Sequence, residues 1–298
     1  MNRPQNAVLR VVDPGPLTLL EDLGRVTGAA IGLPRGGAVD RAGLRLANRL
    51  VGNPEHAAGL EVLWGGLVVE ALADTVISVC GAPVSVTIDG RAERSHTAVP
   101  VRAGAVIALG RCVLGRCVVR GVRPLVAVAG GLAGESLLGS VSASPAAGLG
   151  RAPLVAGDLL MSAGLPTTPW ITTDLGLTVG HDPHRPLRVI GGPRDDWLTD
   201  TARGLFATTG WRVGPQCDRV GIRLEGPPLA WSHPGRELPS EAVVPGAVQV
   251  PPEGRPLVFL ADHPTTGGYP VVGVVHPDDL DALGQAGPGD EVRFRWWR

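Results

Sequence analysis

The chain has 298 residues, of which 44% are hydrophobic and 18% charged, and it carries 43 glycines and 28 prolines. This length predicts two domains that each bury a core, and the composition is typical of a globular, turn-rich protein with few long helices. The formal net charge of −1 excludes a strongly basic surface for nucleic acid or an anionic membrane, so a small-molecule substrate and protein partners remain. All 27 basic side chains are arginine, which excludes a Schiff-base lysine, a P-loop lysine and a lysine general base.

The N-terminal residues 1–6 lack the apolar region of a signal peptide. No apolar run approaches the roughly 18 residues needed to span a bilayer, so we expect a cytoplasmic protein without membrane contact. The four cysteines have neither C-x-x-C spacing nor the density of a disulfide scaffold, and we expect buried thiols. A pair between Cys112 and Cys117 across a hairpin turn is the alternative.

Residues 32–40 form a glycine-rich turn directly before a predicted helix over residues 40–51. Asp40 is expected to cap this helix, because a short polar side chain at that position accepts a hydrogen bond from a free backbone amide. Helix starts attract anions, and an arginine beside one binds a carboxylate through two hydrogen bonds. The candidate substrate-binding residues of this segment are Arg35, Gly36, Gly37 and Asp40. A tight turn with a simple helix cap explains the same residues.

Short apolar or alternating runs bounded by turn residues follow, and they predict a mainly β fold of barrel or sandwich type. The expected strands of this part are Leu67–Glu70, Thr75–Cys80, Ser85–Ile88, Ala105–Leu109, Cys117–Val119 and Leu125–Val128. Only two more helices are expected, both short, over residues 199–207 and 277–283. A Gly-Asp turn before an apolar strand occurs at 157–158 and again at 289–290, a pattern typical of a duplication.

Residues 166–186 contain four prolines, several threonines and two histidines without periodicity, which is linker composition. We therefore expect an N-terminal domain over residues 1–165 and a C-terminal domain over residues 187–298, with the first strand able to cross between them. His181 and His184 have metal-like spacing, but Pro183 prevents the helix that would bring them to one face. We expect no metal site in this chain. The common G-x-S-x-G, H-E-x-x-H and G-x-G-x-x-G motifs are also absent from the sequence.

Three polar, glycine-bearing clusters interrupt the apolar strands of the C-terminal domain, at residues 218–226, 240–252 and 262–270. Loops of this kind at strand ends commonly carry binding and catalytic residues. The candidate substrate-binding residues in the first two clusters are Asp218, Arg219, Glu241 and Gln249. An ordinary surface ion-pair series and a solvent-facing strand glutamine are the alternatives for these positions.

The third cluster follows the apolar strand Leu257–Leu260 and combines a carboxylate, an imidazole, hydroxyls and flexible backbone amides. These groups can polarise a carbonyl and move a proton. The candidate catalytic residues are Asp262, His263, Thr265 and Thr266, and the candidate substrate-binding residues are Gly267 and Gly268. A Gly-Gly turn with solvated polar residues is the alternative explanation.

In order and spacing these segments resemble the allophanate hydrolase subunit 2 family, also called the biotin-dependent carboxyltransferase family, which includes the C subunit of bacterial 5-oxoprolinase and the kinase regulator KipA. The resemblance covers nearly the whole chain, through residues 21–25, 32–40, 46–48, 51–54, 127–131, 218–226, 240–252 and 262–270. Cys217 and Ala242 depart from the serine and glycine common in the family. Residues 144–148 also lack the bulkier, arginine-containing loop expected there.

The resemblance implies two cyclophilin-like β-barrels and an ATP-dependent hydrolysis of the cyclic amide 5-oxoproline to glutamate. The site would be shared with a subunit-B-like partner, of the allophanate hydrolase subunit 1 type, and with a larger ATP-using subunit, so that ATP binds with or through a partner. In this hypothesis Asp262 and His263 transfer the proton, the amides of residues 265–268 bind the oxyanion, and Arg35 or Arg219 binds the substrate carboxylate. Two alternatives stay open: carboxyl transfer from carboxybiotin to urea or a related amide, and a non-catalytic, KipA-like regulator that binds a kinase inhibitor.

Overall fold

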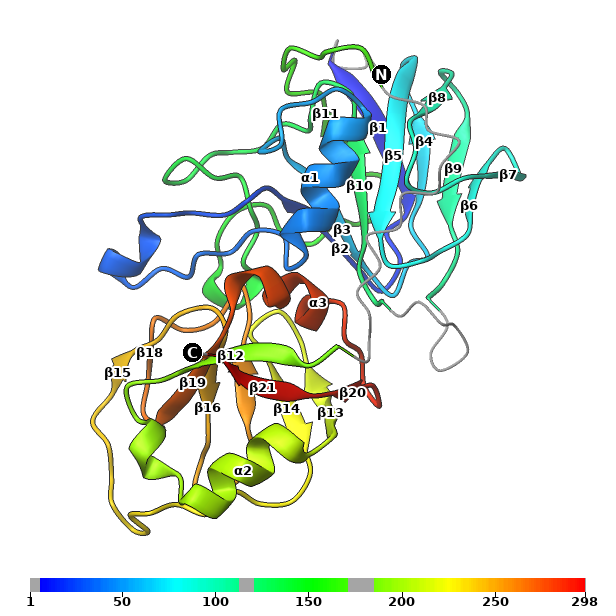
Figure 1. Ribbon diagram of the computed structural model, residues 1–298. Coiled ribbons are helices and arrows are strands. Elements are labelled where there is room, and N and C mark those ends of the chain that lie inside the picture. Colours follow the sequence, from blue (N-terminus) through cyan, green and yellow to red (C-terminus); the bar gives the residue numbers. More distant parts are fainter. Residues whose placement is uncertain (1–5, 113–120, 171–184, 298) are drawn as a thin grey trace. The chain divides into compact units, whose positions relative to one another are not determined.

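The computed structural model of the chain describes residues 6–112, 121–170 and 185–297 (Figure 1). The chain divides into two compact units. Unit 1 comprises Met1–Val26 and Gly36–Gly180, and unit 2 comprises Thr27–Arg35 and His181–Arg298. The expected strand 117–119 and most of the expected linker lie outside the described residues.

Unit 1 consists of two antiparallel sheets that enclose one apolar core. The first sheet has the order β11 (Leu159–Met161), β1 (Ala7–Asp13), β4 (Val68–Ala71), β9 (Val106–Leu109), β6 (Val86–Ile88) and β7 (Arg91–Glu93). The second has the order β2 (Leu17–Glu21), β3 (Gly59–Leu63), β10 (Pro124–Val128), β5 (Thr75–Gly81) and β8 (Val99–Val101). The first strand, β1, pairs with β4 and β11 and therefore stays within unit 1.

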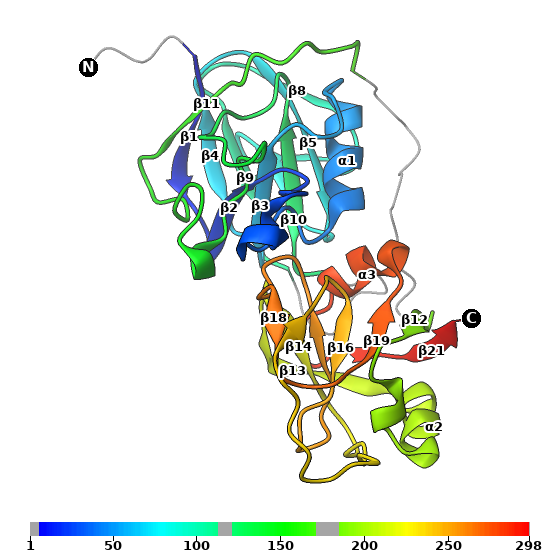
Figure 2. The same cartoon turned by 90° about the vertical axis from the view of Figure 1, so that its left-hand side faces the viewer.

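The helix α1 (Arg41–Leu50) begins where the sequence predicts it, because Asp40 Oδ1 accepts a hydrogen bond of 2.7 Å from the amide of Gly43. Figure 2 shows α1 beside β5 and β10 of the second sheet. Alternate residues of β10 serve two cores: Val126 contributes to the core between the sheets, and Ala127 packs against the helix. This double burial explains why the strand is apolar at every position.

Unit 2 is built on one eight-stranded sheet. Its order is β20 (Glu291–Val292), β13 (Trp211–Cys217), β14 (Gly221–Glu225), β17 (Leu257–Phe259), β16 (Ala247–Gln249), β19 (Val271–Val275), β12 (Leu187–Gly191) and β21 (Phe294–Trp297). The two end strands, β20 and β21, are separated in sequence by Arg293 alone. One short stretch of chain thus pairs with both ends of the sheet and nearly closes it into a barrel. The expected mainly β class with few short helices is confirmed.

The remaining elements of unit 2 are short. Thr199 caps α2 (Asp200–Thr208), and Phe206 of this helix stacks on Phe294 of β21 with ring centroids 4.7 Å apart. The other helix, α3 (Leu280–Gly284), directly follows a 3-10 turn, η4 (Pro277–Asp279). Unit 2 also contains the 3-10 turns η1 (Gly28–Ile31) and η3 (Asp195–Trp197), whereas η2 (Pro145–Ala147) belongs to unit 1. No helix in the described part of the chain has the length and apolar character needed to cross a bilayer.

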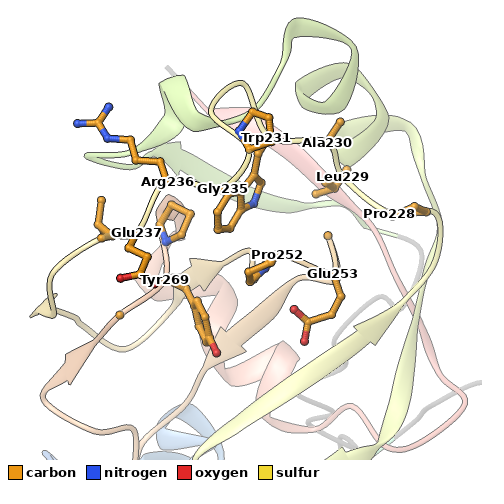
Figure 3. Close-up of a pocket in the computed structure, with 15 residues that line it drawn as sticks. Pro228, Leu229, Ala230, Trp231, Gly235, Arg236, Glu237, Pro252, Glu253 and Tyr269 are labelled. Atoms are coloured by element: carbon orange, nitrogen blue, oxygen red, sulfur yellow. The ribbon is translucent and has the colours of Figure 1, made fainter.

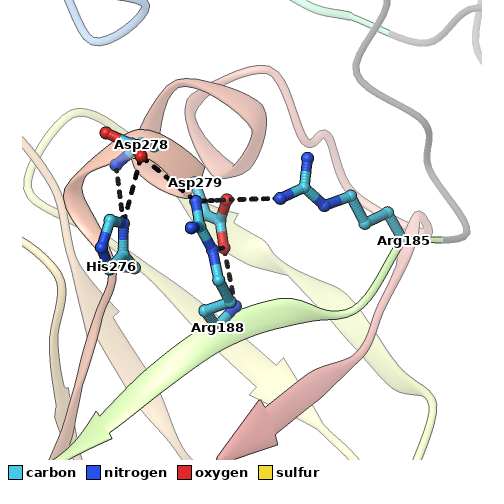
Figure 4. Close-up of polar contacts among 5 residues, drawn as sticks. All are labelled: Arg185, Arg188, His276, Asp278 and Asp279. Carbon is cyan, nitrogen blue, oxygen red and sulfur yellow. Dashed lines mark hydrogen bonds and ion pairs between the residues drawn. The ribbon is translucent and has the colours of Figure 1, made fainter. Parts of the chain in front are cut away.

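A buried carboxylate joins β12 to η4 (Figure 4). Asp279 Oδ2 accepts hydrogen bonds from the backbone amide and Nε of Arg188, at 2.7 and 2.9 Å, and Arg188 Nη2 donates to Oδ1 at 2.8 Å. Arg185 approaches the same carboxylate at 3.7 Å, while His276 Nδ1 accepts from the amide of Asp278. Burial acts to raise the pKa of Asp279, but the hydrogen bonds from Arg188 outweigh it, and the pKa lies below its ordinary value.

Candidate functional site

The third polar cluster of the sequence, residues 262–270, forms a loop between β17 and β19, and we call it the motif loop. Its middle contains β18 (Thr266–Gly267), which pairs with β15 (Glu241–Ala242) in a two-stranded ribbon separate from the barrel sheet. Glu241 lies opposite Gly267, and the amide of Val243 donates to the carbonyl of Thr265 at 3.0 Å. The second and third sequence clusters therefore meet in one place.

A buried ion pair fixes the start of the motif loop. Arg219 Nε donates to Asp262 Oδ2 at 3.0 Å and Nη2 donates to Oδ1 at 3.1 Å. The side chains are 8% and 2% exposed, and the amide of Asp262 also donates to the carbonyl of Arg219 at 2.9 Å. Two parallel hydrogen bonds of this kind hold a carboxylate in a set orientation. The structure thus brings together two candidate residues that are far apart in the sequence.

His263 is buried next to this pair. Its Nδ1 lies 2.6 Å from the carbonyl of Pro264, and because a carbonyl only accepts, Nδ1 carries the proton. Burial lowers the pKa of His263 below its ordinary value, although the Pro264 hydrogen bond and the charge of Asp262 act in the opposite direction. At neutral pH the imidazole is therefore uncharged, and Nε2 is the ring atom with a lone pair.

The rest of the motif loop is more open. Thr266 and Gly268 are exposed, and Thr265 and Gly267 are half-buried. Gln249 of β16 is buried rather than solvent-facing, and its Nε2 donates to the carbonyl of Tyr269 at 2.9 Å. A Cβ on Gly267 would collide with this amide, which explains the glycine. Sequence candidates from the second and third clusters thus pack directly against each other.

Arg194 is a residue of this region that the sequence reasoning missed. It follows β12 in a Gly-Gly-Pro-Arg turn, and its Nε and Nη2 both donate to the carboxylate of Glu241. The pKa of Glu241 lies below its ordinary value, mainly because of the hydrogen bond from Arg194. Arg35 was marked as a candidate because it lies beside a Gly-Gly pair, and Arg194 also lies close to one, so a comparable signal was available in the sequence.

A groove of about 710 Å³ opens where the motif loop ends. Figure 3 shows Trp231 and Tyr269 on its flanks, with Pro252 between them and Glu253 beside Pro252. Tyr269 is 45% exposed, whereas the indole Nε1 of Trp231 donates to a backbone carbonyl, that of Val250, at 3.2 Å. Volume and lining are those of a small-ligand pocket. Trp231 lies outside the three sequence clusters, and its part in the groove depends on tertiary packing.

Asp218 has a local role in the described structure. Its Oδ1 accepts hydrogen bonds from the amides of Val220, at 2.8 Å, and Gly221, at 3.1 Å, and this closes the turn between β13 and β14. The turn presents Arg219 to Asp262. Asp218 therefore supports the site through the backbone.

Three of the four candidates before the first helix have local backbone roles in unit 1. Asp40 is buried as the helix cap, and Gly37 has a φ of +89° in a turn where a Cβ would lie 2.7 Å from the amide nitrogen of Gly24. Gly36 also has a positive φ, of 63°. Arg35 belongs to the segment counted with unit 2, whereas the other three belong to unit 1. The tight-turn explanation accounts for both glycines.

A polar network in unit 1 was also missed. The buried Asp22 accepts hydrogen bonds from the hydroxyls of Ser140, at 2.7 Å, and Ser142, at 2.6 Å, and from the amide of Val141, at 2.8 Å. Arg25 is buried beside them and donates to the carbonyl of Ser142. The segment 21–25 supported the family resemblance, but nothing in its residue pattern indicated partners more than a hundred positions away.

Within the described residues, no group of three or more histidine, cysteine or acidic side chains is placed to hold a metal ion. His181 and His184 lie outside those residues, as does Cys117. Cys80 is buried, and Cys112 and Cys217 are partly buried. Burial raises the pKa of Cys80 to about 12 and that of Cys112 to about 11.

Comparison with known protein families identifies the family of this chain. Residues 31–296 match the carboxyltransferase domain, subdomains A and B. The chain belongs to this family. The predicted family is thus confirmed, and the match takes in all three polar clusters of unit 2.

This chain is similar both to proteins of about its own length and to part of much longer proteins. It is 30% identical to the 5-oxoprolinase C subunit of Escherichia coli, over 96% of this chain and 90% of that protein. The C subunit of the Haemophilus influenzae 5-oxoprolinase is 29% identical over the same proportions. A putative urea carboxylase of Emericella nidulans is 31% identical, but this chain spans only 24% of it.

Solved structures share the fold. The crystal structure of TTHA0988 superposes with a TM-score of 0.85 and 36% identity, over 99% of this chain and 56% of that one. The urea amidolyase of K. lactis gives a TM-score of 0.86 and 25% identity, over all of this chain and 19% of that one. The same fold thus occurs as part of longer chains.

Proposed function

We propose that this chain is a subunit of an ATP-dependent 5-oxoprolinase, which opens the cyclic amide 5-oxoproline to glutamate. The observation that carries the proposal is the extent of the match to the 5-oxoprolinase C subunit, which covers 96% of this chain and 90% of that protein. The matches to urea carboxylase and urea amidolyase reach similar identity but cover 24% and 16% of those proteins. The proposed complex also contains a subunit-B-like partner and a larger protein that uses ATP.

In the proposed reaction an unstrained lactam resists water, and phosphorylation of its amide oxygen by ATP activates the carbonyl carbon. Water adds to this carbon, the C–N bond breaks as the ring nitrogen takes a proton, and the acyl phosphate that remains is hydrolysed by a second water to glutamate and phosphate. The sequence contains no lysine, and so no P-loop lysine, and ATP is therefore assigned to a partner or to a shared surface. His263, neutral and with Nε2 as its acceptor, takes the proton from the attacking water. The backbone amides of residues 265–268 face the oxyanion.

The ion pair between Arg219 and Asp262 has a different role in this proposal. Both oxygens of Asp262 already accept a hydrogen bond from Arg219, at 3.0 and 3.1 Å, in a buried place. Asp262 therefore orients the loop that carries His263. This revises the roles expected from the sequence, in which both side chains transfer the proton.

Reconstitution tests the proposal. Proteins that co-purify with this chain are identified, and the mixture is assayed for glutamate release from 5-oxoproline with ATP, with each component omitted in turn. We expect glutamate only from the complete mixture and a loss of at least about a hundredfold with His263→Gln, the usual scale for a general base. Absence of glutamate from the complete mixture contradicts the function, and turnover by this chain alone contradicts the shared site.

A second candidate is carboxyl transfer from carboxybiotin to urea or a related amide, because a putative urea carboxylase is 31% identical to this chain. The two reactions differ in their products. Labelled bicarbonate with a biotinylated carrier and urea would give a labelled carboxyl product only in carboxyl transfer. Glutamate release without label incorporation favours the oxoprolinase.

A further inference from the structure

The ribbon of β15 and β18 needs support from outside its own backbone pairing. Each strand is two residues long, and the ribbon is separate from the eight-stranded sheet. Short two-stranded ribbons are marginally stable by themselves. The motif loop nevertheless passes through this ribbon at Thr266 and Gly267, so its position depends on what holds β15.

Arg194 connects β15 to the barrel. Its backbone amide donates to the carbonyl of Val271 on β19 at 3.1 Å, and its guanidinium donates through two nitrogens to Glu241 of β15. The turn that precedes Arg194 is packed tightly on the same strand: a Cβ on Gly192 would collide with the carbonyl of Val271, and the amide of Gly192 donates to Val272. Arg194, whose backbone is bound to β19, therefore holds β15 of the ribbon through its ion pair with Glu241.

Glu241 transmits this attachment to the motif loop. It lies opposite Gly267 in the ribbon register. Gln249 packs close to Gly267 and donates to the carbonyl of Tyr269, whose side chain lines the groove. The middle of the motif loop is therefore held between Arg194–Glu241 and the barrel strand β16.

We propose that Arg194 is a positioning residue, which holds residues 265–268 and the Tyr269 wall of the groove in their binding arrangement through Glu241. The pair is partly exposed, with side chains 38% and 26% accessible, so it adds little to global stability. Its effect is local order in the ribbon. The use of that order in catalysis rests on the proposed function, whereas the order itself does not.

Hydrogen exchange on the isolated chain tests the local effect. In Arg194→Gln we expect backbone amides in peptides covering 241–243 and 265–268 to exchange about tenfold faster, with the melting temperature nearly unchanged, because a local opening becomes easier. Arg10→Gln is the matched control, since it breaks a pair with Glu70 in unit 1 whose side chains are 47% and 18% exposed. Unchanged exchange in Arg194→Gln, or the same acceleration in the control, overturns the proposal.

A charge swap between positions 194 and 241 provides a second test of the proposal. Glu241→Arg alone should accelerate exchange in the same peptides, and combination with Arg194→Glu should restore protection. In the reconstituted complex Arg194→Gln should raise the KM for 5-oxoproline several-fold with a smaller change in kcat. A wild-type complex without activity contradicts the proposed function, while the exchange result still decides the role of Arg194. A failure of the double variant to restore protection contradicts the pairing.

Discussion

Removal of the guanidinium of Arg219 should destabilise unit 2 strongly. In Arg219→Ala the buried Asp262 loses the two hydrogen bonds, of 3.0 and 3.1 Å, that Arg219 donates to its two oxygens. Breaking a buried ion pair by deletion of one partner costs about 3–5 kcal/mol, because the other charge stays in a poorly solvated place. For a unit of this size the loss corresponds to a fall in melting temperature of roughly 10–20 °C.

Thermal unfolding followed by tryptophan fluorescence measures this effect. All tryptophans except Trp64 and Trp170 lie in unit 2, so the signal reports mainly on that unit. Arg293→Ala is the control, because it removes an exposed pair with Glu291 and should cost less than about 1 kcal/mol.

The double variant Arg219→Met/Asp262→Leu separates the charge effect from the packing effect. It should recover most of the lost stability, since an apolar pair leaves no buried charge without its partner. If Arg219→Ala unfolds within about 1 kcal/mol of the wild type, the pair is worth no more than a surface one and the reasoning is refuted.

Three further predictions concern single positions. Because the folded-state pKa of Asp279 lies below its ordinary value of 3.8, its contribution to stability should be present above that pH and disappear as the pH falls below it, and Asp279→Asn should flatten this part of the acid-unfolding curve. Gly267→Ala should lower activity of the complex by displacing Gln249, whereas Gly268→Ala, whose Cβ would have its nearest neighbour at 3.9 Å, should have a smaller effect; equal losses contradict this. Cys80, with a pKa of about 12, should be alkylated at pH 8 only after unfolding, as peptide mass mapping would reveal.

Local patterns predicted part of the secondary structure. The helix that Asp40 caps and the strands around residues 67–71, 75–81 and 124–128 lie where caps, turn residues and apolar periodicity placed them. Such signals act over a few residues and survive in any tertiary context that buries the apolar face. The 3-10 turns at 28–31, 145–147 and 195–197 were missed, because one turn of helix leaves no periodicity to detect.

The candidate site was predicted in part. Asp262 and His263 were placed at a strand end next to a glycine turn, and the structure has them there. Two arginines of the region have other roles than expected. Arg219 was expected to bind substrate but pairs with Asp262, and Arg194, which pairs with Glu241, was not a candidate. Each partner lies on another strand or turn, and its approach depends on strand register.

The sequence by itself determined the strand-rich class, the family and the position of the polar clusters that form the candidate site, since composition, periodicity and motif spacing can be read along the chain. Only the tertiary structure decided which side chains meet: the Arg219–Asp262 and Arg194–Glu241 pairs, the contact of Gln249 with Gly267, and the groove beside Tyr269. The physical reason is that ion pairs and pockets depend on distances of a few ångströms between residues tens of positions apart. Such distances are set when the barrel closes.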